Sequence, residues 1–255
     1  MTTEAPVILE IRDLQRRFGT KLVHRGVDLD LRRGELLALF GESGTGKSLI
    51  LRSIIGLEEP DAGSVRWHGR LLSGLSEEQW IEPRKKISYV FQNGALFDSL
   101  TVHENLAYPL RAHTQLDEAA IRVRVSAMLA LVGMPGTEGL LPGELSGGMQ
   151  KRAGLARAMI LDPEILLFDE PTAGLDPSNT ARFVQNILEL KKRGQTGIFV
   201  THDISSALAV ADRIAILHEG RIHCIQTVDE IRRSNDPVVR RFLNPEERAH
   251  EPEGK

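Results

Sequence analysis

The stretch Leu36-Leu-Ala-Leu-Phe-Gly-Glu-Ser-Gly-Thr-Gly-Lys-Ser48 decides the fold. Its first part, Leu36–Phe40, is an apolar run that predicts a buried strand, and the residues after Lys47 have the pattern of a helix. Between them, Gly41–Ser48 fits the form G-x-x-x-x-G-K-[S/T]. The glycines let backbone N–H groups wrap phosphate oxygens, and the helix start adds partial positive charge. An accidental glycine-rich turn explains this context poorly, so the sequence predicts a P-loop.

A P-loop predicts ATP and Mg²⁺ as the bound species. Lys47 is expected to reach the β- and γ-phosphates of ATP, and the Ser48 hydroxyl is expected to ligate Mg²⁺. The other residues expected to contact the nucleotide in this loop are Gly41, Ser43, Gly44, Thr45 and Gly46.

A second motif, Ile165-Leu-Leu-Phe-Asp-Glu170, reads as a strand buried on both faces that ends in two carboxylates. Ligands bind at the carboxyl ends of strands in open α/β sheets. We therefore expect Asp169 to be a partner of Mg²⁺ and Glu170 to polarise a water molecule against the γ-phosphate. A strand that ends in Asp-Glu is by itself weak evidence for such a nucleotide site. The P-loop upstream strengthens it.

Strand and helix patterns alternate along the chain, which predicts an α/β fold with a mostly parallel sheet. The region from about 93 to 156 reads as helical, with Ile121, Val125 and Leu129 at amphipathic spacing. We interpret it as a helical subdomain inserted into a core formed by 1–92 and 157–243, the whole being one domain. Residues 244–255 are polar and are expected to form a frayed tail. The strands expected are Val7–Ile11, Glu35–Phe40, Ile87–Phe91, Ile165–Phe168, Gly197–Thr201 and Arg213–Leu217.

The third motif, Leu145-Ser-Gly-Gly-Met-Gln-Lys-Arg152, narrows the choice among the many NTPases that contain a P-loop. Ser146, Gly147 and Gly148 at a helix start form a second cradle for phosphate. With this tetrapeptide the sequence resembles the ABC ATPase family over nearly the whole chain. The resemblance implies a RecA-like P-loop NTPase core, an N-terminal antiparallel β subdomain and a head-to-tail homodimer. Each ATP would lie between one P-loop and the partner's signature helix, and would be hydrolysed there to ADP and phosphate.

The resemblance also assigns roles to four further residues. Phe18 falls where the family stacks an aromatic ring on adenine, although a core phenylalanine at a strand end is the alternative. Gln92 matches the glutamine that senses Mg²⁺ and water. Asp176 matches the loop that crosses the dimer, and His202 matches the histidine that contacts the γ-phosphate and steadies Glu170.

Composition limits the partners. The 32 basic and 35 acidic residues give a net charge of −3, which provides no general attraction for nucleic acid. The lone Cys224 excludes an internal disulfide and favours a reducing cytoplasm. No signal peptide is expected, and no apolar run approaches the roughly 18 residues of a membrane span. If the protein serves transport, another chain must supply the pore. The resemblance to ABC ATPases then implies a peripheral subunit at the cytoplasmic face of the bacterial inner membrane.

Four segments are similar to the ATPases of Mla/Mce-type bacterial lipid transporters: Phe91–Phe97, Glu104–Arg111, Met149 and Asp236–Leu243. By that resemblance the partners are a multi-spanning permease and a lipid-binding MCE-domain protein. The apolar patch Ala95–Leu100 either receives a helix of the permease or packs inside the helical subdomain.

Three other functions are alternatives to a lipid-transport ATPase. An importer of polar solutes is the main alternative to a lipid transporter. A non-transport ABC ATPase usually carries two ATPase heads, long coiled coils, zinc modules or basic arms, none of which this sequence has. A phosphate-binding module without catalysis is hard to reconcile with Glu170 and His202 both present.

Overall fold

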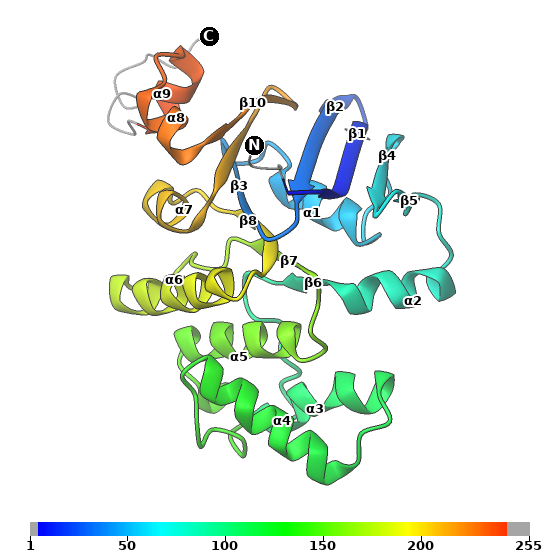
Figure 1. The fold of residues 1–255 in the computed structure, drawn as a ribbon, viewed down its shortest axis with the longest axis vertical. Coiled ribbons are helices and arrows are strands. Elements are labelled where there is room, and N and C mark those ends of the chain that lie inside the picture. Colours follow the sequence, from blue (N-terminus) through cyan, green and yellow to red (C-terminus); the bar gives the residue numbers. More distant parts are fainter. Residues whose placement is uncertain (1–4, 244–255) are drawn as a thin grey trace. The chain divides into compact units, whose positions relative to one another are not determined.

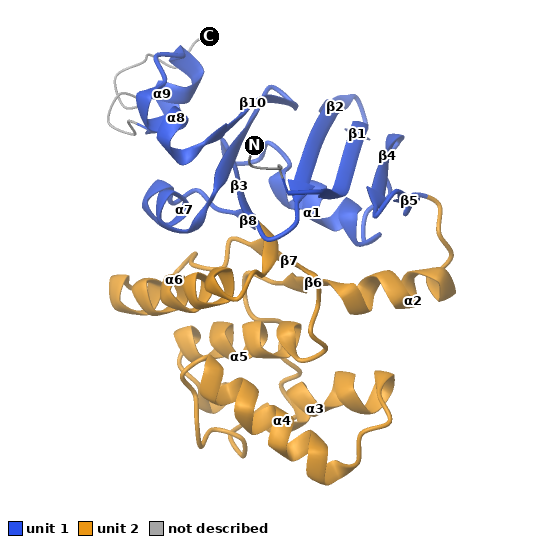
Figure 2. Ribbon diagram, viewed as in Figure 1, with its two compact units in different colours: residues 1–73, 199–255 blue, residues 74–198 orange. Residues whose placement is uncertain are grey.

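The computed structural model describes residues 5–243 and divides the chain into two compact units. The first unit contains residues 1–73 and 199–255, and the second contains 74–198 (Figure 2). The expected helical subdomain, 93–156, falls inside the wider second unit, and its boundaries stay a prediction. The expected tail, 244–255, lies outside the described residues.

The first unit begins with an antiparallel sheet of strand order β2-β1-β4-β5 (Figure 1). Its strands are β1 (Val7–Phe18), β2 (Lys21–Arg32), β4 (Ala62–Trp67) and β5 (Arg70–Leu71). Leu9 and Ile11 of β1 and Leu29 and Leu31 of β2 are fully or almost fully buried, which gives the sheet its apolar face. The sequence had predicted only the start of β1 and none of β2. Charged residues and register shifts interrupt the alternation there.

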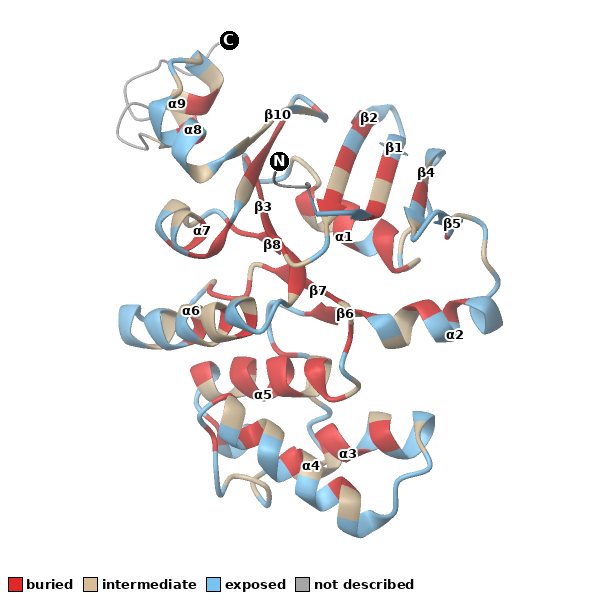
Figure 3. Ribbon diagram, in the orientation of Figure 1, coloured by how far each residue is buried: buried red, intermediate tan, exposed pale blue. Residues whose placement is uncertain are grey.

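The same unit holds the strand that leads into the P-loop. Strand β3 (Leu36–Gly41) pairs in parallel with β9 (Arg213–His218), and β9 pairs antiparallel with β10 (Arg221–Thr227). Every residue of β3 is buried (Figure 3). The helices of this unit are α1 (Lys47–Ile54), α7 (Ile204–Val210), α8 (Val228–Arg233) and α9 (Pro237–Leu243). The parallel pairing of a fully buried strand is what a run such as Leu36–Phe40 predicts.

The second unit combines a parallel strand pair with most of the helices. Strand β6 (Ile87–Val90) pairs in parallel with β7 (Ile165–Asp169). Strand β8 (Thr196–Val200) runs across the boundary between the units. The helices are α2 (Glu77–Lys86), α3 (Val102–His113), α4 (Glu118–Leu131), the 3-10 helix η1 (Pro142–Glu144), α5 (Gly147–Met159) and α6 (Pro177–Lys192).

Side-chain caps fix where these helices begin. Thr101 and Glu104 form a capping box at the start of α3, and Asp117, Ser146 and Asp176 accept a backbone N–H at the starts of α4, α5 and α6. The helical character predicted for the middle of the chain is confirmed. Helix α2 was not predicted, because its sequence is largely charged and carries an internal proline, Pro83.

The α/β class with a parallel core and an antiparallel N-terminal sheet is confirmed. No helix within the described residues is long and apolar enough to cross a membrane.

An ion pair of the buried Glu35 joins the N-terminal and C-terminal segments of the first unit. Arg213 at the start of β9 donates to Glu35 through Nε at 3.0 Å and Nη2 at 2.7 Å. The Glu35 carboxylate also accepts the Arg32 backbone N–H at 3.0 Å, and Arg213 reaches the Asp30 carbonyl at 3.0 Å. These bonds hold the entrance of β3 against β9.

Replacing Arg213 with Met should therefore destabilise the fold. The change leaves the buried Glu35 carboxylate without its cation and should lower the free energy of unfolding by about 3 kcal/mol. Urea denaturation would measure this free energy. Arg122 is exposed, so the control variant Arg122→Met should stay within about 0.5 kcal/mol of wild type. The double variant Glu35→Gln/Arg213→Met should recover part of the loss. An unchanged urea midpoint for Arg213→Met would contradict this account.

Candidate functional site

The P-loop encloses a buried cation. Lys47 is the first residue of α1 and only 5% exposed, and its ammonium donates to the carbonyls of Gly41 at 2.9 Å and Glu42 at 2.8 Å. A buried ammonium must be hydrogen-bonded, so these carbonyls fix Lys47 within the loop. Gly44 and Gly46 both have positive φ, 76° and 94°, which turns the loop tightly before the helix starts.

A residue that sequence reasoning missed, His24, supports the last turn of this loop. The His24 ring is fully buried on β2, and its Nε2 lies 3.1 Å from the Gly46 carbonyl oxygen. Burial lowers the pKa of His24, which the bond to Gly46 partly opposes. The neutral ring therefore donates from Nε2 to Gly46. A Cβ added to Gly46 would lie 2.5 Å from that nitrogen. In the sequence, His24 stands between Val23 and Arg25 and belongs to no motif, so nothing there indicated this role.

Two further candidates of the first unit are exposed. The Phe18 side chain is 46% exposed, so the alternative of a core phenylalanine is wrong. The guanidinium carbon of Arg16 lies 4.8 Å from the Phe18 ring centroid, and Glu58 and Asp61 pair with that guanidinium. His202 lies two residues after the end of β8 and is exposed.

The acidic candidates lie in the second unit. Asp169 ends β7 and is buried, and the Tyr89 hydroxyl on β6 donates to its Oδ2 at 2.6 Å. Tyr89 was missed because one tyrosine in an apolar strand reads as core. Glu170, the next residue, is half-buried and has a φ of 44°, an uncommon backbone conformation for glutamate. Gln92, after β6, is exposed.

The signature motif opens α5. The Ser146 hydroxyl accepts the Met149 N–H at 3.3 Å, and Ser146 and Gly147 are exposed. Gly148 is buried, and a Cβ on it would lie 2.6 Å from the Asn179 side-chain oxygen. Asn179 in turn donates to Asp176 through its backbone at 2.9 Å and its side chain at 2.6 Å. These bonds hold the pKa of Asp176 below its usual range. Asn179 therefore lies between the signature glycine and Asp176.

The candidate residues thus form two sets. Phe18, Gly41–Ser48 and His202 belong to the first unit, whereas Gln92, Ser146–Gly148, Asp169, Glu170 and Asp176 belong to the second.

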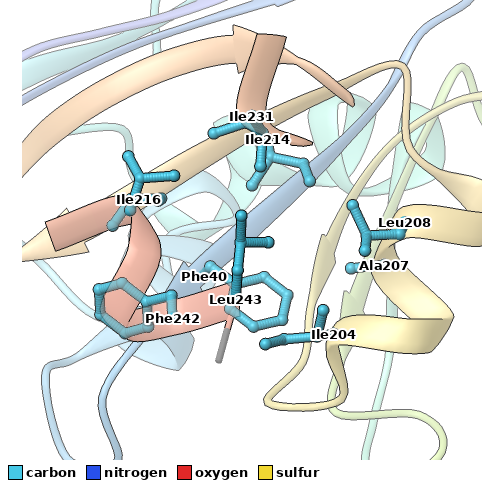
Figure 4. Close-up of a pocket in the computed structure, with 10 residues that line it drawn as sticks. Phe40, Ile204, Ala207, Leu208, Ile214, Ile216, Ile231, Phe242 and Leu243 are labelled. Carbon is cyan, nitrogen blue, oxygen red and sulfur yellow. The ribbon is translucent and has the colours of Figure 1, made fainter. Parts of the chain in front are cut away.

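An apolar hollow also lies in the first unit (Figure 4). Phe40 of β3 lines it, together with Ile204 and Leu208 of α7 and Phe242 and Leu243 of α9. The residues given for its wall are all apolar, so it has no donors for phosphate. It is a gap in the core between α7 and α9, beside the strand that leads into the P-loop.

Comparison with known proteins identifies the family. The profile described as ABC transporter matches residues 24–173, which is more than half of the chain. The chain belongs to the ABC transporter family. As a member of this family it is an ATP-binding ATPase.

Two curated relatives are similar to this protein over most of its length. It is 42% identical to a protein of Mycobacterium leprae (strain TN) named "Probable ribonucleotide transport ATP-binding protein mkl", over 93% of this chain and 69% of the relative. It is 38% identical to the intermembrane phospholipid transport system ATP-binding protein MlaF of Escherichia coli (strain K12). That match covers 93% of this chain and 88% of the relative.

Among solved structures, the ABC chain is similar to the ATP-binding cassette MJ0796, described as a dimer in a post-hydrolysis state bound to ADP and Pi. The TM-score is 0.79 at 29% identity, and the match covers 87% of this chain and 99% of that one.

The P-loop geometry makes a prediction about two glycines. Gly46→Ala combines a positive φ with a clash against His24, whereas Gly44→Ala has a positive φ but no atom within 4 Å of the added Cβ. Gly46→Ala should lower ATP affinity more than about a hundredfold, whereas Gly44→Ala should lower it only about 5–30-fold, the equivalent of roughly 1–2 kcal/mol of left-handed strain. Titration with a fluorescent ATP analogue measures both.

His24→Ala in the Gly46→Ala background removes the nitrogen that the new methyl group meets, and should restore part of the affinity. Equal losses for the two glycine variants would show that the contact with His24 does not shape the loop.

Proposed function

We propose that this ABC family member is the ATP-hydrolysing subunit of a lipid transporter, driving movement through a separate permease. The observation that carries the proposal is the presence of two phosphate cradles in one chain: the Gly41–Ser48 loop and the exposed start of α5 at Ser146 and Gly147. A carboxylate pair at the end of β7 supplies the acidic groups that hydrolysis needs.

The residues fit ATP and Mg²⁺. The positive-φ loop around the buried Lys47 ammonium suits the β- and γ-phosphates. The Ser48 hydroxyl, the Asp169 carboxylate and the Gln92 amide are oxygen donors, the class that Mg²⁺ prefers. Bound Mg²⁺ would neutralise charge on the phosphate oxygens. Tyr89 restrains the Asp169 carboxylate through its 2.6 Å hydrogen bond, which favours one fixed orientation toward the ion.

In the proposed reaction a water molecule attacks the γ-phosphorus and the bond to the β-phosphate oxygen breaks. Lys47 stabilises charge on the β- and γ-phosphates, while Glu170 orients the water and accepts its proton. His202 contacts the γ-phosphate and steadies Glu170, and Gln92 senses the water and the ion. Phosphoryl transfer asks little covalent chemistry of the protein, so positioning and charge carry most of the catalysis.

The second cradle implies a homodimer. The exposed Ser146 and Gly147 at the N-terminus of α5 would bind the ATP held by the partner's P-loop. Asp176 would lie in the loop that crosses the dimer, and the exposed Phe18 ring would stack on adenine. The dimeric structure of MJ0796 supports this arrangement.

An aromatic surface in the second unit fits a membrane partner. Phe97 is 49% exposed and Tyr108 is 57% exposed, with ring centroids 5.7 Å apart. Arg157 lies beside Phe97, its guanidinium carbon 5.6 Å from the ring. Such exposure favours a groove for a permease helix over simple packing of Phe97. We place this surface on a helical subdomain of about 93–156 and the protein at the cytoplasmic face of the bacterial inner membrane.

The cargo separates two candidate functions. The Escherichia coli relative is named for phospholipid transport, and the resemblance to Mla/Mce-type ATPases supports lipid, with an MCE-domain protein as a further partner. The Mycobacterium leprae relative is named for ribonucleotide transport, which favours a polar solute instead.

Purification with the native membrane partners distinguishes these candidates. Mass spectrometry of the complex should find a multi-spanning subunit, an MCE-domain protein and bound phospholipid, and ATP should drive fluorescent phospholipid between vesicles. Uptake of labelled ribonucleotide into vesicles, without phospholipid movement, would replace the lipid proposal with the polar-solute one.

Glu170→Gln tests the chemical step. The change keeps the shape of the side chain and removes the negative charge beside the water, so ATP hydrolysis should fall about 10²–10⁴-fold while ATP binding persists. The variant should accumulate as an ATP-bound dimer in size-exclusion chromatography with Mg-ATP. Near-normal turnover would mean that another group, with His202 the first to examine, orients the water.

A further inference from the structure

A buried lysine on the signature helix has no role in the function proposed above. Lys151 lies on α5, three residues after Gly148, and is only 8% exposed. Fully buried lysines are rare in proteins unless their charge is partnered. The Lys151 ammonium donates to the backbone carbonyl of Ala173, in the segment that follows β7.

The same ammonium lies in the field of Glu170. Burial lowers the pKa of Lys151, and the negative charge of Glu170 opposes that shift. Glu170 and Ala173 are the two ends of one turn, in which the Ala173 N–H donates to the Glu170 carbonyl at 3.1 Å. This is also the turn in which Glu170 holds its φ of 44°. The Lys151 side chain therefore bonds to one end of this turn, at Ala173, and carries a charge opposite to that of Glu170 at the other end.

A second contact joins α5 to the same segment further along. Gly148 packs against the Asn179 side chain, and Asn179 holds Asp176 through two hydrogen bonds. The segment 170–176 is thus attached to α5 at Ala173, through Lys151, and at Asp176, through Asn179. Both attachments lie within the second unit.

We propose that Lys151 is a positioning residue that ties the signature helix to the turn bearing Glu170. Movement of α5 then changes the orientation of the Glu170 carboxylate. The inference rests on the proposed function, in which α5 meets the partner's ATP while Glu170 acts on the ATP of its own P-loop. Lys151 would connect the two nucleotide sites of the dimer through one protomer.

Lys151→Met tests this role, because methionine keeps an unbranched apolar side chain and removes both the charge and the donor. We expect kcat to fall about 10–100-fold, while the Kd for ATP changes less than twofold, since the P-loop is untouched. Lys192→Met, which removes an exposed lysine from α6, is the matched control and should keep wild-type kcat. Lys151→Gln keeps a donor for the Ala173 carbonyl, so its kcat should lie between the kcat of wild type and that of Lys151→Met.

A double-mutant cycle separates positioning from general damage. If Lys151 acts through Glu170, then Glu170→Gln/Lys151→Met should hydrolyse ATP in a single turnover at the same residual rate as Glu170→Gln. The double variant should still form the ATP-bound dimer. Structural damage would instead multiply the two losses or abolish the dimer.

The outcomes distinguish the two proposals. Normal turnover by Glu170→Gln would overturn the proposed role of Glu170 itself. A slow Glu170→Gln combined with a normal Lys151→Met, or with multiplied losses in the double variant, would overturn the role of Lys151 alone. If Lys151→Met does not fold, the cycle with Lys151→Gln decides the question in the same way.

Discussion

The Lys47 ammonium sits at the end of a fully buried strand, and the geometry of the P-loop depends on how that charge is held. An ammonium at this depth costs free energy unless it is hydrogen-bonded, and the carbonyls of Gly41 and Glu42 provide those bonds. They can do so only because the chain turns sharply between β3 and α1. The turn uses glycines at positive φ, and His24 of the antiparallel sheet fixes the last of them. Lys47 is therefore positioned by two strands of the first unit together, β3 directly and β2 through His24.

The sequence predicted those features that depend on one uninterrupted stretch of chain. Leu36–Phe40 and Ile165–Phe168 are apolar throughout because both faces of their strands are covered, and they became β3 and β7 with little change. The polar residues that follow them were equally predictable, since ligands bind where parallel strands end. Asp169 and Lys47 needed only the local pattern.

What the sequence did not predict depends on contacts between distant segments. Strand β2 carries charges and register shifts that remove the alternation expected of a strand. His24, Tyr89 and Lys151 look like isolated polar residues until the fold brings them to Gly46, Asp169 and Ala173. Each partner is a single carbonyl or carboxylate at least 22 positions away in the chain. Sequence spacing does not predict such a pair, because the residues around one partner do not depend on the residues around the other partner.

These pairs suggest why α5 is the central element of the second unit. Gly154 of this helix packs so closely on Gly94, in the loop after Gln92, that a Cβ would lie 2.6 Å from the Gly94 Cα. Lys151 holds the turn after Glu170, and Gly148 packs on the residue that holds Asp176. The three segments assigned to water, catalysis and the dimer interface are thus each attached to one rigid helix. Two of the attachments are glycines: Gly154 approaches the Gly94 backbone and Gly148 the Asn179 side chain, and such close packing leaves little room for sliding. A shift of α5 by a fraction of an ångström must therefore displace all three segments or break a buried contact.

Packed cores resist small continuous deformation and prefer discrete arrangements. A helix whose exposed end is proposed to meet phosphate, and whose buried face holds the turn that follows Glu170, has the connections that a two-position switch requires.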